Sequence, residues 1–143
     1  MKKIIYTRAD GGVSIVSPAM ANQLATETEA EFMARIQARV VPVDAINPQI
    51  VDESAIPVDR TFRNALKQTG SALIHDMPTC RQIQEKRIED ARKHKMQEFL
   101  LRAELGENVV TEKAAIQAIN ARTLCATAQT PEELKTIMPT ILK

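Results

Sequence analysis

Between residue 79 and residue 104 the chain contains no glycine and no proline, and no other feature constrains its fold as much. At a rise of about 1.5 Å per residue, a helix that begins near Met77 and covers this stretch is roughly 40 Å long. Its middle, residues 85–95, offers only Ile88 and Ala91 to a core. The sequence therefore predicts a long helix that stands partly in solvent or lies along a partner.

A β-hairpin is predicted at the start of the chain. Residues 3–8 and residues 13–17 are two short β-prone runs. Between them, Asp10-Gly11 is a pair that readily takes the positive φ of a tight hairpin turn. We therefore expect two antiparallel strands joined at this turn.

A helix is predicted next, because two capping boxes follow one another. In the first, Thr26 would pair with Glu29, and in the second, Thr28 would pair with Glu31. Apolar side chains recur on one face of this helix, which we expect to cover the hairpin. They are Phe32, Met33, Ile36 and Val40.

Prolines shorten the elements that follow. Residues 49–52 are expected to form a third strand, at an edge of the sheet, because proline cannot donate to a strand ladder. Residues 59–66 are expected to form a turn in which Phe62 and Leu66 fill the small core. Residues 71–74 would add a last short strand.

Two further helices are expected after the long one, which Gly106 would end. Residues 111–128 carry a face of small apolar side chains that should pack antiparallel against the apolar end of the long helix. The small face comprises Ala114, Ala115, Ala118, Ile119, Ala121 and Leu124, and its expected partner comprises Met96, Phe99, Leu100 and Ala103. Thr130 followed by Pro131 predicts the start of a short last helix.

The predicted fold is therefore α+β, in two parts. Residues 1–75 form a small head with a β-hairpin, a helix and a strand, and residues 76–143 form an arm with a helical hairpin and a short terminal helix. Aromatic residues make up 3% of the chain and tryptophan is absent, so the core must be thin. We expect stability to depend on self-association or on a partner.

No motif in the chain indicates catalysis. His75 and His94 stand in no metal-binding or nucleophile motif, and no glycine-rich phosphate loop is present. Cys80 and Cys125 lack the close ligand pairs of a structural zinc site, so we expect small core residues in a reducing compartment. The sequence predicts no enzyme activity, no cofactor, no metal and no membrane segment.

Basic side chains gather on the long helix, including Arg87, Arg92 and Lys95. Acidic residues lie three or four positions away and would neutralise many of them. They are Glu85, Glu89, Asp90 and Glu98. A formal net charge of +1 also gives no long-range field that would attract nucleic acid. The pattern favours a helix that faces a protein partner over a DNA-binding surface.

Arg60 and Arg63 flank Phe62 in the predicted turn, and two interpretations are open. In the first, Phe62 is buried and the arginines pair with Asp52, Glu53 or Asp59. In the second, this surface docks a partner, because arginines beside an aromatic residue are good interface anchors.

At these residues the chain resembles a group of small bacteriophage proteins encoded near virion and tail genes. The likeness comprises the first two strands with their Asp10-Gly11 turn, Ile50-Val51-Asp52, the motif from Ile56 to Ala65, Asp76-Met77-Pro78 and the stretch from Thr130 to Lys135. It covers nearly the whole chain, and residues 59–65 are its most specific part. Where the motif commonly continues with tryptophan, this chain has Leu66. The resemblance implies a phage context but no mechanism.

These observations predict a non-enzymatic phage protein of the tail or head-tail region, present in the host cytoplasm during assembly and then in the virion. It would bind other virion proteins, or further copies of itself, through Arg60, Phe62 and Arg63 in the head and Arg87, Arg92 and Lys95 in the arm. An alternative is a tail or tail-fibre assembly chaperone that is absent from the mature particle. A small DNA-binding regulator is a third hypothesis.

Overall fold

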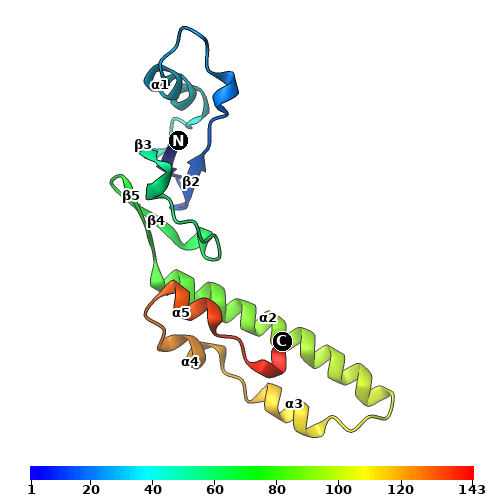
Figure 1. Ribbon diagram of the computed structural model, residues 1–143. Helices are drawn as coiled ribbons and strands as arrows, with labels where there is room; N and C mark the ends of the chain where they lie inside the picture. The colour runs from blue at the N-terminus through cyan, green and yellow to red at the C-terminus, as the bar shows by residue number, and fades with distance from the viewer. The chain divides into compact units, whose positions relative to one another are not determined.

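The computed structural model describes residues 1–143 and confirms the α+β class. The chain divides into two units, Met1–Asp76 and Met77–Lys143. All five strands lie in the first unit, called the head, whereas the second, called the helical unit, contains only helices (Figure 1).

The head is built on a three-stranded antiparallel sheet of order β2-β1-β3. Strand β1 (Lys2–Thr7) pairs with β2 (Val13–Val16) on one side and with β3 (Ile46–Asp52) on the other. Gly11 has a φ of +81° in the turn between β1 and β2, which confirms the predicted hairpin. The prediction that the third strand lies at an edge is also confirmed, although it begins three residues earlier than expected.

Helix α1 (Glu29–Val40) covers one face of this sheet (Figure 1), as the sequence predicts. Its N-terminus uses the second of the two capping boxes, because the Thr28 side chain accepts from Glu31 N and the Glu31 side chain accepts from Thr28 N. Phe32 and Met33 pack against Ile4. The expectation for Val40 is wrong: this last residue of α1 is 40% exposed.

The other face of the sheet is covered by a second hairpin, which comprises β4 (Leu66–Thr69) and β5 (Ala72–His75). Strand β5 agrees with the expected last strand, whereas β4 was not predicted. Phe62 and Leu66 are both buried, as expected, and Leu66 joins the core beneath the sheet. Short 3₁₀ turns complete the head at Met20–Asn22, Glu53–Ala55 and Arg63–Ala65.

Helix α2 (Met77–Glu104) has the predicted length. Gly106 ends it with a φ of +87°, and the amides of Gly106 and Glu107 donate to the carbonyls of Ala103 and Arg102. These two bonds form a Schellman motif, which satisfies carbonyls that the helix end leaves open.

The predicted single helix over residues 111–128 is wrong. Two helices, α3 (Val110–Gln117) and α4 (Ala121–Ala126), replace it. The Asn120 side chain accepts from Thr123 N and so caps a new helix where continuation was expected. The last helices are α5 (Pro131–Thr136), capped by Thr130 as predicted, and a 3₁₀ turn at Thr140–Leu142.

The break between α3 and α4 also changes which side chains pack against α2. Ala114, Ala115 and Ala118 are exposed, and Ala121 is the one alanine of the expected seam that is buried. On the expected partner face, Leu100 and Ala103 are exposed as well. Instead, Phe99 packs with Val109 and Ile116. Elsewhere in the helical unit, the buried apolar residues are Cys80, Ile88, Ala121, Cys125, Ala128 and Leu134.

Candidate interaction surfaces

The basic stretch of α2 is largely neutralised by the helix's own acidic residues. Arg92 Nη2 lies 2.8 Å from Glu89 Oε2, and Lys95 Nζ lies 2.9 Å from Glu98 Oε2. In a third pair, Lys86 Nζ lies 2.7 Å from Asp90 Oδ2. The hydrogen bond from Lys86 is the main reason that the pKa of Asp90 is lowered. Two of the predicted partner-binding cations, Arg92 and Lys95, are therefore already paired within the helix.

Phe99 has two cations beside its ring. Lys95 Nζ and the Arg102 guanidinium lie 5.8 Å and 5.1 Å from the ring centroid. The ring itself is buried among the apolar side chains between α2 and α3. Lys95 thus has a structural role in addition to any role in binding, because cations over a ring stabilise it.

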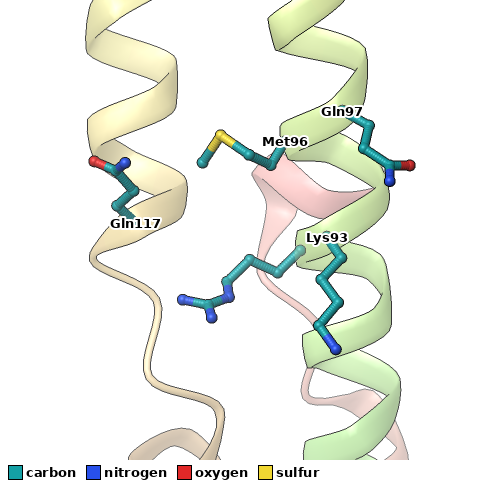
Figure 2. A pocket seen from close by; sticks show the side chains of 5 residues that line it. Lys93, Met96, Gln97 and Gln117 are labelled. Carbon is teal, nitrogen blue, oxygen red and sulfur yellow. The ribbon is translucent and has the colours of Figure 1, made fainter.

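A shallow hollow of about 380 Å³ lies beside Arg92 and Lys93, with Met96, Gln97 and Gln117. Figure 2 shows Met96 reaching from α2 toward α3, where Gln117 lies, whereas Gln97 points away. Besides Met96, two cations and two amides line this hollow, and no acidic residue does.

Two polar side chains of α2 hold the C-terminal segment in place. Gln84 is buried and donates from Nε2 to the carbonyl of Ile137 at 2.6 Å. Arg81 donates from Nη2 to the carbonyl of Ala128 at 2.8 Å. Arg87, another predicted binding residue, is exposed and donates to Gln84 Oε1 at 3.4 Å. These contacts explain how a helix with few apolar residues still anchors its neighbours.

Apolar side chains remain exposed at the far end of α2 and the start of α3. Leu101, Leu105 and Val110 are 62%, 82% and 73% exposed. A second apolar hollow is formed by Ala115, Ala118, Ile119, Leu124 and Pro139, with Asn120 and Thr123. The helical unit therefore exposes apolar side chains at this end, and four cations of α2 are paired with acidic residues.

The head shows the opposite arrangement at the loop of residues 59–65. Phe62 is 2% exposed, so its ring belongs to the interior and is not itself an exposed anchor. Arg60 and Arg63 are exposed and form no ion pair. The expected pairing partners are engaged elsewhere, because Asp52 binds Lys2 and Glu53 binds Lys3.

Arg60 and Arg63 line a hollow of about 460 Å³ together with the hairpin of β1 and β2. Arg8 lines it too, and sequence reasoning did not identify this residue. Arg8 lies at the end of β1 and Arg60 far along the chain, so only the folded head brings them together. The other lining residues are Tyr6, Gly12, Val13, Ser14, Ile15, Val16, Asn64 and Leu66.

The next features are the groups that could bind a metal ion and the two cysteines. No group of three or more histidine, cysteine, aspartate or glutamate side chains is placed to hold a metal ion. Cys80 and Cys125 are free and buried, and burial raises the pKa of the Cys125 thiol. None of the helices is both long enough and apolar enough to cross a membrane.

Comparison with protein-family profiles, with curated proteins and with solved structures found no match for this chain.

Proposed function

We propose that the protein is a non-enzymatic component of a bacteriophage virion, in the tail or head-tail region, that binds other virion proteins or further copies of itself. The phage context comes from the resemblance of residues 56–65 and of the flanking segments. The protein-binding role is supported by the surfaces of the two units.

The observation that carries the proposal is the exposed apolar end of the helical unit. Leu101 lies in the last turn of α2 and Leu105 directly follows the helix, where its N–H donates to the Leu101 carbonyl at 3.2 Å, and both side chains are mostly exposed. Clustered exposed apolar side chains are typical of surfaces that a partner covers. In a ring or a fibre, many copies of a weak contact of this kind add up through multivalency.

The charge pattern favours a protein partner over DNA. Arg92, Lys95 and Lys86 each have an acidic partner within 3 Å on the same helix. A phosphate backbone would have to compete with these carboxylates for each of the three cations. A gel shift that weakens with salt would revive the regulator hypothesis.

Quantitative mass spectrometry of purified phage particles and of the cleared lysate tests the proposal. A virion component is present in particles at a fixed ratio to the portal or tail proteins. An assembly chaperone is absent from particles and co-purifies with a tail protein from lysate only, and this outcome would replace the proposal.

A variant connects this test to the apolar end of the helical unit. Phage grown with the double variant Leu101→Gln and Leu105→Gln should incorporate much less of the chain than wild-type phage. Ala103→Gln is the matched control, because Ala103 is exposed on the same turn and offers little apolar surface. Equal incorporation of both variants would show that this end of the helix is not the binding surface.

A further inference from the structure

The hollow lined by Arg8, Arg60 and Arg63 lies along an open strand edge. Strand β2 is the outermost strand of the sheet and pairs only with β1. All four residues of β2 line the hollow. Successive side chains of a strand point to opposite faces of the sheet, so a hollow that contacts all four wraps around the edge of β2.

This edge carries backbone groups that a further strand can use. In an antiparallel ladder, every second residue of an edge strand points its N–H and C=O groups away from its partner. Val13 is such a residue, because its carbonyl accepts from Arg8 Nη1 at 3.2 Å, outside the ladder. Ile15 lies two residues further on and has the same orientation.

The charge around the edge is positive. Three arginines line the hollow and no acidic residue does. Arg8 Nε lies 3.2 Å from Asp10 Oδ1, so Arg8 already has an ion-pair partner. Of the three arginines that line the hollow, Arg60 and Arg63 have none. An occupant that brings carboxylates would supply the missing partners.

Hydrogen bonds within the loop fix the backbone at Arg60 and Arg63. Thr61 N donates to Asp59 Oδ1 at 2.8 Å, Arg63 N donates to the carbonyl of Arg60 at 3.2 Å, and Ala65 N donates to the carbonyl of Phe62 at 2.8 Å. With Phe62 buried between them, the two arginines are displayed from a folded turn. Such preorganisation lowers the entropic cost of binding.

We propose that the head binds an extended acidic segment of a partner protein, which adds to the edge of β2 as a further strand and places its carboxylates on Arg60 and Arg63. The inference rests on the proposed function, since it specifies the kind of segment that a virion partner would offer. Strand addition draws its affinity from main-chain hydrogen bonds and its specificity from side-chain contacts. The hollow offers arginines to a nucleic acid, but no exposed aromatic ring lies there for a base to stack on.

The test uses the purified full chain and a fluorescein-labelled octapeptide of alternating valine and glutamate. Its anisotropy titration should saturate, and the peptide with glutamine in place of glutamate should bind about tenfold more weakly or worse. The variant Arg60→Gln with Arg63→Gln should lose about tenfold in affinity as well. Equal binding of the acidic and neutral peptides would overturn the proposal.

A matched control removes the same charge elsewhere. Arg39 and Arg122 are exposed and have no ion-pair partner, so Arg39→Gln with Arg122→Gln should change affinity by less than about twofold. If this control weakens binding as much as the loop variant does, the peptide responds to net charge and the proposed site is wrong.

Backbone pairing is tested separately from charge. Peptide should shift the amide signals of Val13 and Ile15 in the NMR spectrum of the protein, and N-methylation at one set of alternate peptide residues should abolish binding. If inorganic phosphate shifts the same signals and displaces the peptide at equal concentration, the hollow is a simple anion site and strand addition is wrong. Because these assays use the isolated chain, they can fail while its presence in particles stands, and the reverse also holds.

Discussion

The long helix α2 and the loop of residues 59–65 both carry basic residues, but they use them differently. On α2, Lys86, Arg92 and Lys95 each form an ion pair with an acidic residue of the same helix. In the loop, Arg60 and Arg63 are exposed without such a partner. The number of cations in a segment is therefore a poor guide to binding, because their nearest acidic neighbours decide whether they are available.

The two units bury their apolar residues differently. Helix α2 has only three apolar buried residues along its length, Cys80, Ile88 and Phe99, and leaves leucines exposed at its far end. The head covers both faces of its sheet, with α1 on one side and the second hairpin on the other. Exposed apolar side chains occur in both units, so the contrast between α2 and the loop is one of charge pairing.

The largest expected loss of stability comes from substitution of Phe99, the ring that lies beside Lys95 and Arg102. Phe99→Ala should destabilise the protein by about 3–5 kcal/mol, because it removes a buried ring and leaves a cavity between α2 and α3. Chemical denaturation followed by circular dichroism measures this loss. Phe99→Leu, the control, should cost much less. Equal and small losses would mean that the ring is not what holds this end of α2.

The turn that ends α2 should have the next largest effect. Gly106 has a φ of +87°, and open space surrounds the position of an added Cβ, so Gly106→Ala tests backbone strain alone. The expected cost is about 1–2 kcal/mol. Thermal unfolding measures it, with Ala103→Gly as a comparison within the regular helix. A neutral Gly106→Ala variant would contradict the Schellman end.

The sequence was sufficient wherever a local signal decides the structure. Asp10-Gly11 predicted the first hairpin and Thr130 predicted the start of α5. Two overlapping capping boxes limited the start of α1 to two positions, and the structure uses Thr28 with Glu31. Each of these works through hydrogen bonds or φ angles within a few residues, so no distant contact is needed.

The sequence failed where distant contacts or competing signals decide. Strand β4 has only Leu66 as an apolar residue, and its pairing with β5 shows that a buried position can create a strand from a polar run. The alanines before Asn120 favour a continuous helix, but the Asn120 cap interrupts it. The arginine loop was recognisable, whereas its hollow needed β2, which lies far away in sequence.

As the pH falls, the head should unfold before the helical unit. Four carboxyl groups of the head have a lowered pKa, against one in the helical unit, mainly through hydrogen bonds from arginine, lysine or backbone N–H groups. They are Asp10, Glu27, Glu31 and Asp52 in the head and Asp90 in the helical unit.

A carboxyl group whose pKa is lower in the folded than in the unfolded chain stabilises the fold above its unfolded pKa. This contribution is lost as the pH falls through the folded pKa. In an NMR titration from pH 7 to about 2, we expect the folded signals of the head to fade first. Glu27→Gln, which removes the contact with Arg35, should reduce this sensitivity. If the folded signals of the helical unit fade first, these carboxyl groups do not determine the acid stability of the head.

The smallest effects test the comparison itself, because Lys95→Gln and Arg63→Gln each remove one positive charge. Lys95 loses its ion pair with Glu98 and its place over the Phe99 ring, so we expect a loss of about 0.5–1 kcal/mol. Arg63 has no such contacts, and its substitution should change the free energy of unfolding by less than about 0.5 kcal/mol. Urea denaturation of both variants at one salt concentration measures the difference.

These two variants should show opposite responses to ionic strength and to peptide. Salt screens the Lys95 ion pair, so the stability gap between Lys95→Gln and wild type should narrow as salt rises. Arg63→Gln should keep the stability of the wild type at every salt concentration and lose affinity for the acidic peptide. If Arg63→Gln proves as destabilising as Lys95→Gln, Arg63 contributes to holding the head together. Its charge would then be no more available for binding than the charges of α2.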